Sequence, residues 1–146
     1  MLLPGTVTIV VPALILWLGG WDVRPVTAIL GGLLVAAGLF LVVWTIRLFV
    51  VVGRGTLAPW DPTAALVARG PYRYVRNPMI TGVATILAGQ ALFFRSWGIA
   101  IELVVFVLVN ALYFLFVEEP GLRRRFGTEY EEYCARVPRW LPRVRL

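Results

Sequence analysis

Four stretches of this sequence contain no charged residue, and they constrain the fold more than any other feature. They cover residues 1–21, 25–46, 77–94 and 103–117. A helix needs roughly 20 apolar residues to cross the ~30 Å hydrocarbon core of a bilayer. The first three stretches meet or approach this length, and the fourth does so if Glu102 is included. We therefore predict a membrane protein with about four spanning helices.

The composition of the chain supports an all-α integral membrane fold. Of its 146 residues, 60% are hydrophobic and 15% are charged, against about 45–50% and about 25% in soluble domains. Helices in lipid pair their backbone groups internally and need no water-soluble core. The first stretch lacks the basic segment and cleavage site of a signal peptide. We expect a single membrane domain, 1–146, with spans about 3–20, 25–52, 78–95 and 97–118, a cytoplasmic loop 53–77 and a short helical cytoplasmic tail 119–146.

Arginines set the orientation of the predicted helices. The loop 53–77 and the tail 119–146 hold most of the basic residues, all of which are arginine. Because arginine accumulates on the cytoplasmic side, and four spans place both segments on one side, both termini are expected to be cytoplasmic. The absence of lysine suggests a GC-rich genome, so we predict the inner membrane of a bacterium. The net charge of +6 then reflects topology and contact with anionic membrane lipids, and no nucleic-acid partner is expected.

Two further patterns predict helix contacts and the form of the tail. Gly31 and Gly38, and Gly82 and Gly89, are each seven residues apart, which places them on one helix face where backbones can approach; glycine is also simply common in such helices. In the tail an apolar stripe recurs at helical spacing. It predicts two short helices that are broken near Gly127, ended by 137–138 and folded back over the loop. Thr128 and Glu131 have the spacing of a capping box.

Two motifs flank the last two predicted spans and carry the functional signal. Residues 70–82 read GPYRYVRNPMITG and lead into the third span. Residues 118–139 read EEPGLRRRFGTEYEEYCARVPR and lead out of the fourth. With the stretch 57–62, LAPWDP, they resemble the superfamily of isoprenylcysteine carboxyl methyltransferases and phospholipid N-methyltransferases over residues ~53–142. These are membrane-embedded enzymes that use S-adenosylmethionine and release S-adenosylhomocysteine.

The resemblance implies a cofactor pocket and a set of candidate residues. It places the cofactor against Gly70, Tyr72, Tyr74, Arg76, Asn77, Pro78, Gly82, Glu118 and Glu119. An arginine suits the carboxylate of S-adenosylmethionine, a glutamate suits its ammonium or ribose, and a tyrosine face suits the sulfonium. Glu118 and Glu119 are also the candidate catalytic bases. Tyr130, Tyr133 and Arg139 are candidate substrate-binding residues, although the two tyrosines also fit a purely packing role.

The methyl acceptor is expected to be lipophilic and to enter from the membrane. Asn77 stands where the carboxyl methyltransferases usually have histidine. Phe114 stands where the eukaryotic members carry an arginine suited to a carboxylate substrate. The first expectation is therefore a phospholipid amine such as phosphatidylethanolamine, and the alternative is carboxyl methylation of an isoprenylcysteine-like or other lipophilic molecule.

Other classes of function find less support in the sequence. There is no histidine and only one cysteine, Cys134, so we expect no metal site and treat Cys134 as an incidental apolar position. A small four-span transporter of cations is the alternative from another class, and it would need an acid near the middle of the membrane. The only candidate, Glu102, lies near the outer boundary, where we expect it to be snorkelled or paired with an arginine.

Overall fold

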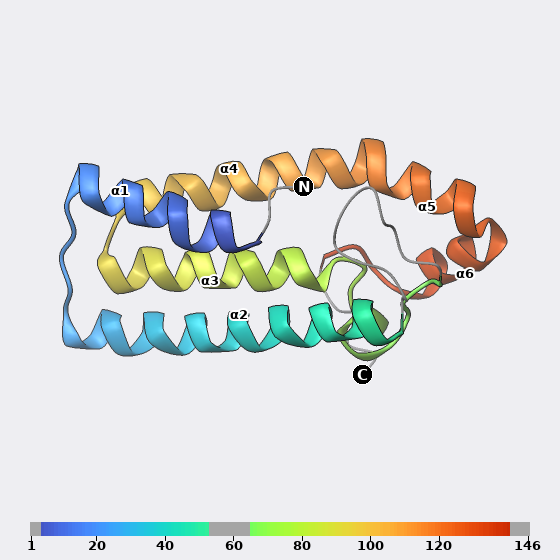
Figure 1. The fold of residues 1–146 in the computed structure, drawn as a ribbon, viewed down its shortest axis with the longest axis horizontal. Coiled ribbons are helices and arrows are strands. Elements are labelled where there is room, and N and C mark those ends of the chain that lie inside the picture. The colour runs from blue at the N-terminus through green and yellow to red at the C-terminus, as the bar shows by residue number, and fades with distance from the viewer. Residues whose placement is uncertain (1–3, 53–64, 141–146) are drawn as a thin grey trace. The chain divides into compact units, whose positions relative to one another are not determined.

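The computed structural model describes residues 4–52 and 65–140, and within them it contains helices and no strand (Figure 1). The all-α prediction is confirmed. The elements are η1 (Thr6–Val10), α1 (Val11–Gly19), α2 (Pro25–Val51), η2 (Gly70–Arg73), α3 (Pro78–Phe94), α4 (Trp97–Tyr113), η3 (Phe114–Glu118), α5 (Glu119–Phe126) and α6 (Thr128–Arg136).

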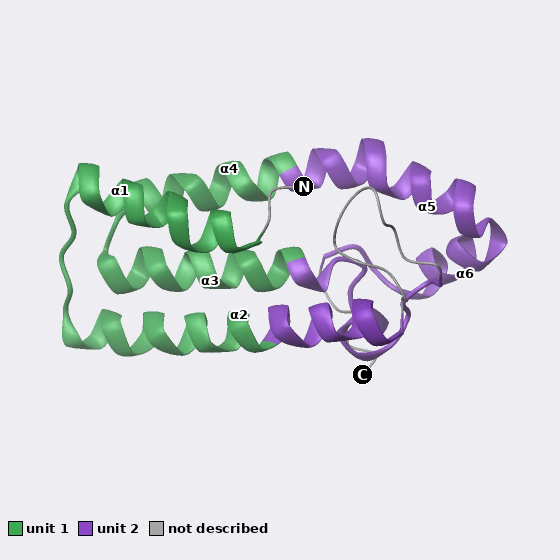
Figure 2. Ribbon diagram, in the orientation of Figure 1, with its two compact units in different colours: residues 1–40, 80–109 green, residues 41–79, 110–146 purple. Residues whose placement is uncertain are grey.

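The helices belong to two compact units, coloured separately in Figure 2. Unit 1 comprises residues 1–40 and 80–109, and unit 2 comprises residues 41–79 and 110–146. Unit 1 therefore contains α1, the first part of α2 and most of α3 and α4, whereas unit 2 contains the candidate loop and tail. The expectation of a single membrane domain stays a prediction, and each unit is described separately below.

Close contact between α2 and α3 defines unit 1, and it depends on glycine. A Cβ atom added at Gly31 would lie 2.5 Å from the carbonyl oxygen of Gly89, and one at Gly38 would lie 2.7 Å from that of Gly82. Real Cβ atoms do not approach backbone so closely, so these positions must lack a side chain. The two glycine pairs face each other across the helices. The prediction that they permit backbone approach is confirmed.

Polar contacts in unit 1 lie at the helix ends and between helices. The Arg95 guanidinium pairs with the Asp22 carboxylate at 2.7 Å, and the Gln90 side chain donates to the carbonyl of Thr8 at 2.8 Å. Glu102 was expected to snorkel or to pair with an arginine. Both of its carboxylate oxygens are instead buried, without a hydrogen-bond partner in the described part of the chain.

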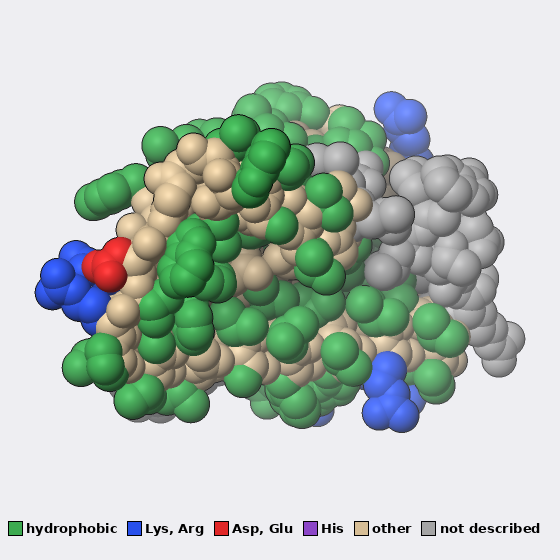
Figure 3. All heavy atoms as spheres, turned by 60° about the vertical axis from the view of Figure 1, so that its left-hand side comes forward, with side chains coloured by type: hydrophobic (Ala, Val, Ile, Leu, Met, Phe, Trp, Pro, Cys, Tyr) green, Lys and Arg blue, Asp and Glu red, His purple; other side chains and the backbone are tan. Residues whose placement is uncertain are grey.

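Two of the helices are long and apolar enough to cross a membrane. Within the described residues these are Pro25–Val51 and the continuous run Trp97–Phe126, while Thr6–Gly19 and Pro78–Phe94 are shorter apolar helices. Figure 3 shows hydrophobic side chains over most of the face turned to the viewer. Exposed large side chains such as Phe40 (67%), Trp97 (84%) and Phe116 (70%) are suited to contact with lipid.

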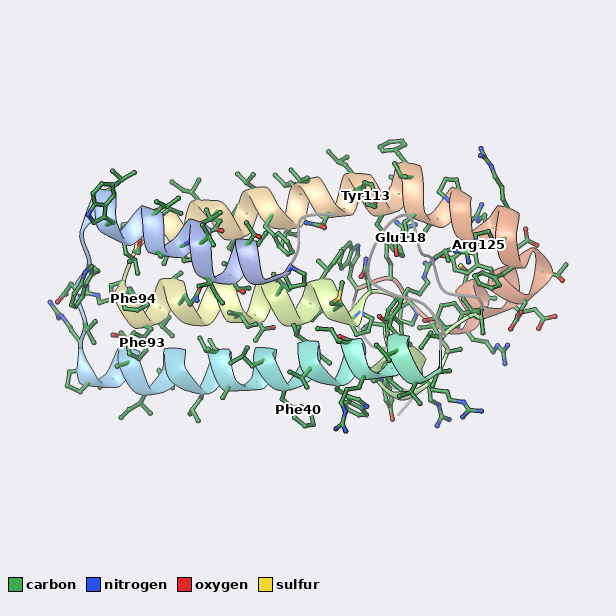
Figure 4. The ribbon with its side chains drawn as sticks, viewed as in Figure 1. Phe40, Phe93, Phe94, Tyr113, Glu118 and Arg125 are labelled. Atoms are coloured by element: carbon green, nitrogen blue, oxygen red, sulfur yellow. The ribbon has the colours of Figure 1, made fainter. Side chains whose placement is uncertain are left out.

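The fourth apolar helix does not end at Glu118, where its span was predicted to stop. The backbone continues through η3 into α5 and ends at Phe126. Figure 4 follows this helix from Tyr113 through Glu118 to Arg125. The charges of Glu118 and Glu119 do not interrupt the helical backbone, and the end of the membrane span at residue 118 stays a prediction.

Candidate active site

The loop before α3 forms a short turn that presents Tyr72. Gly70 begins the 3₁₀ turn η2 with φ of +57°, and a Cβ there would lie 2.8 Å from the Leu48 side chain. Glycine is favoured on both counts. The Tyr72 ring packs edge-on against Phe49, with centroids 5.6 Å apart. The turn is thereby fixed against α2 within unit 2.

The tail contacts the backbone of Tyr72, and burial alters the pKa of the Tyr72 side chain. The Tyr133 hydroxyl donates a hydrogen bond of 2.7 Å to the carbonyl of Tyr72. Burial raises the pKa of Tyr72, and the negative charge of the neighbouring Glu118 raises it further. The phenol therefore remains a neutral hydrogen-bond donor at physiological pH.

The two tail helices pack on each other as the apolar stripe predicts. Tyr130, Tyr133 and Val137 are buried, and further apolar side chains of the tail and loop pack against them: Leu66, Leu122, Phe126 and Cys134. The break falls at Gly127, with φ of +53°, and the second helix ends at Val137 in extended backbone. Both predictions are confirmed. The predicted capping box is wrong, because Gly127 occupies the N-cap and no side-chain cap bond forms.

Glu119 joins the two motifs through an ion network. Its carboxylate accepts a 2.7 Å hydrogen bond from Arg76 Nη1 and two of 3.0 Å from Arg139 Nε and Nη2. The Glu119 side chain is only 6% exposed and that of Arg76 13%. The hydrogen bond with Glu119 raises the pKa of Arg139. The backbone N–H of Arg76 also donates to the carbonyl of Pro138 at 3.0 Å, so the tail folds back over the loop as predicted.

Glu118 differs sharply from Glu119 in its surroundings. Within residues 4–52 and 65–140 its carboxylate makes no ion pair, and the side chain is half-buried. Two arginines and Glu119 leave the network with one net positive charge, and Arg76 Nε is buried without a hydrogen-bond partner in the described chain. Glu118 and the positively charged Glu119 network are therefore adjacent along the chain, and within the described residues the Glu118 carboxylate and Arg76 Nε have no partner.

Unit 2 brings most of the predicted site residues together. Tyr72, Asn77, Pro78, Glu119, Tyr130 and Tyr133 are buried there, Gly70, Arg76, Glu118 and Arg139 are partly buried, and Tyr74 is 63% exposed. Gly82 lies in unit 1, where its carbonyl faces Gly38. The stretch 57–62 lies outside the described residues. The roles proposed for these residues remain predictions.

Two contacts were not anticipated from the sequence. The Cys134 thiol accepts a hydrogen bond from Arg76 Nη1 at 3.1 Å, so Cys134 belongs to the network. Cys134 lies four residues after Tyr130 in α6, and this spacing is the sequence signal that both side chains share one helix face. Phe114 is 2% exposed and packs against Trp140, with ring centroids 6.4 Å apart.

Comparison with known proteins assigns this arrangement to a family. No curated protein and no solved structure matches the chain significantly. The family described as phospholipid methyltransferase matches residues 26–129, which include most of α2, the turn at Tyr72, both glutamates and the start of α6. The chain therefore belongs to the phospholipid methyltransferase family, a family of membrane methyltransferases.

Proposed function

We propose that this protein transfers a methyl group from S-adenosylmethionine to the amine of a membrane phospholipid such as phosphatidylethanolamine. The observation that carries the proposal is the Glu119 network, which joins the loop motif to the tail motif, whereas the adjacent Glu118 makes no ion pair within the described residues. Family membership supports the reaction class and favours an enzyme over a small transporter. The reaction is placed on the cytoplasmic side of the membrane, where both motifs are expected.

The residues of unit 2 fit the chemical groups of S-adenosylmethionine. The positively charged network and the free Nε of Arg76 suit its carboxylate. Glu118 suits its ammonium or ribose hydroxyls, and the neutral Tyr72 phenol can donate a hydrogen bond next to Glu118. Glu119 is already saturated by two arginines, so we assign it the role of holding Arg76 and Arg139 in place.

The protein's own residues would then bind the cofactor, align the acceptor and remove the proton of its ammonium group. When bound, S-adenosylmethionine supplies an electrophilic methyl group on a sulfonium. An amine attacks only when neutral, so the protein must remove the proton of the acceptor ammonium. Glu118 is our candidate to accept that proton, directly or through water. This role is an alternative to its contact with the cofactor, because one carboxylate cannot serve both. The protein must also align the acceptor amine with the methyl group and exclude water.

An amine acceptor is favoured over a carboxylate by the surroundings of Phe114. This ring is buried against Trp140, on the helical turn that ends in Glu118. An apolar wall beside a carboxylate suits a lipid that carries a positive head group. A carboxylate acceptor would instead be repelled by Glu118 and desolvated by the apolar wall. Carboxyl methylation of an isoprenylcysteine-like molecule remains the alternative acceptor chemistry.

Binding of S-adenosylhomocysteine to the full chain in detergent tests the cofactor site. Isothermal titration calorimetry is expected to detect binding by the wild type, and Glu118→Gln is expected to weaken it about tenfold, which corresponds to the loss of one charged interaction. Glu129→Gln is the matched control, because Glu129 is an exposed glutamate in the first turn of α6. No binding by the wild type, or equal effects of the two substitutions, would contradict the proposal.

A further inference from the structure

The two wide helical turns of this structure share one sequence feature. In η1 the N–H of Val11 donates to the carbonyl of Thr6, and in η3 the N–H of Glu119 donates to the carbonyl of Phe114. Both bonds span five residues instead of the four of an α-helix. In each case the next residue is a proline, Pro12 or Pro120. The coincidence at two separate helices points to a local cause.

Proline accounts for this geometry through its ring and its missing donor. Inside an α-helix a proline offers no N–H to the carbonyl four residues back, and its ring collides with that carbonyl. For Pro120 the carbonyl concerned belongs to Phe116, within η3. Widening the preceding turn moves this carbonyl aside and lets Glu119 donate to Phe114 instead. The wide turn accommodates one more residue than an α-helical turn would.

The extra residue determines which way the two glutamates face. Successive residues of an α-helix are rotated by about 100°, so removal of the wide turn would rotate everything after it by about that angle relative to Phe114. In the observed geometry Glu119 meets Arg76 at 2.7 Å and Arg139 at 3.0 Å. A rotation of this size would remove Glu119 from both arginines.

We propose that Pro120 is a positioning residue of the active site, which holds η3 wide so that Glu119 faces the two arginines and Glu118 remains available to ligand. The part that concerns ligand binding rests on the proposed function; the part that concerns the network does not.

The substitution Pro120→Ala restores the missing donor and permits an ordinary α-helical turn. Its matched control is Pro12→Ala, which makes the same chemical change after the wide turn η1 in unit 1. A second variant combines Pro120→Ala with deletion of Phe116, whose side chain is 70% exposed. Because this deletion removes the extra residue, it returns Glu118 and Glu119 to their original faces within an α-helical turn.

Labelling of Cys134 by a maleimide reports on the network without any ligand. Cys134 is the only cysteine of the chain, and its thiol bonds to Arg76, which Glu119 holds in place. We expect Pro120→Ala to accelerate labelling several-fold, Pro12→Ala to leave it unchanged, and the Phe116 deletion to restore the slow rate. Circular dichroism of each variant checks that helical content is retained.

Calorimetry with S-adenosylhomocysteine on the same four proteins extends the test to the site. Affinity is expected to fall about tenfold in Pro120→Ala and to recover with the deletion. Any of three labelling results would overturn the positioning role. These are no change in Pro120→Ala, an equal change in Pro12→Ala, and no return to the slow rate after the deletion. Absence of binding by the wild type, with labelling as expected, would overturn the proposed function alone.

Discussion

Glu119 is the residue on which the charged contacts of unit 2 converge. Its position after an apolar helix could be predicted from the sequence, but its partners could not, because Arg76 and Arg139 are 43 and 20 residues away along the chain. The sequence also predicted equivalent roles for Glu118 and Glu119. The structure separates them, because only Glu119 is enclosed by arginines.

Removal of the Glu119 charge is expected to destabilise the protein. In Glu119→Gln two guanidinium groups lose their counter-charge, and breaking a buried ion pair in this way lowers the free energy of unfolding by about 3–5 kcal/mol. The lower end is expected because the Arg139 side chain is 35% exposed, so solvent screens part of its charge.

Unfolding in detergent, followed by circular dichroism, measures this effect against a surface control. Glu132→Gln removes the partner of Arg136 at 3.8 Å, and both side chains are about three-quarters exposed. Such surface pairs contribute about 0–1 kcal/mol. If both substitutions lowered the unfolding midpoint equally, Glu119 would not hold unit 2 together.

Alkaline pH is expected to unfold the protein through its buried tyrosines. Burial raises the pKa of Tyr72, Tyr130 and Tyr133 above the ordinary value of about 10. Their stabilising contribution is complete below about pH 10. Above it the unfolded chain releases these protons while the folded chain keeps them, so the free energy of unfolding falls as pH rises.

Ultraviolet absorbance of tyrosinate checks the titration directly. In the folded protein part of the signal from the five tyrosines should appear only at the pH of unfolding, and Tyr133→Phe should reduce this late part. Complete ionisation near pH 10 without unfolding would contradict the buried, neutral state assigned to these phenols.

Helices show where sequence patterns succeed and where they fail. The seven-residue glycine spacing predicted the α2–α3 contact because small side chains on one face have a direct geometric consequence. The tail stripe predicted α5 and α6 for the same reason. The wide turn before Pro120 left no such pattern, since it alters backbone pairing without a periodic signal. The Thr128 cap failed because Gly127, with φ of +53°, serves as the N-cap.

The neighbouring glycines Gly31 and Gly32 provide an internal test of the helix contact. In Gly31→Ala the new methyl group would lie 2.5 Å from the Gly89 carbonyl oxygen, so the helices must separate and packing is lost. In Gly32→Ala the methyl group meets nothing within 4 Å, and alanine favours the helix by up to about 1 kcal/mol. Unfolding in mixed micelles should therefore shift to lower denaturant for Gly31→Ala only. Equal shifts would exclude this contact.

Across the whole chain, the distribution of arginine is the feature from which we predict the orientation in the membrane. Among the helices of residues 4–52 and 65–140, two have the length of a full span, while α3, with 17 residues, reaches about 26 Å at 1.5 Å per residue. A helix a few ångströms shorter than the hydrocarbon core is accommodated by local thinning at modest cost. We therefore retain four spans as a proposal, with the Arg76 loop and the tail on the same side.

Reporter fusions test this orientation in a bacterial host. Green fluorescent protein exported through the general secretory pathway does not fluoresce in the periplasm, whereas alkaline phosphatase is active only there. Fusions at either terminus are expected to fluoresce and to lack phosphatase activity. A phosphatase-active fusion at one terminus only would mean an odd number of spans and would contradict the placement of both termini in the cytoplasm.

The central proposal is that this chain methylates a lipid amine at a site that includes Glu118 and the Glu119 network. The most direct measurement reconstitutes the purified full chain in phosphatidylethanolamine bilayers with S-adenosylmethionine labelled in its methyl group, and analyses the lipids by mass spectrometry. The account predicts labelled N-methylated phosphatidylethanolamine with the wild type and with Glu129→Gln, and a strong loss with Glu118→Gln. Cofactor binding without any methylated phosphatidylethanolamine, or full activity in Glu118→Gln, would contradict it.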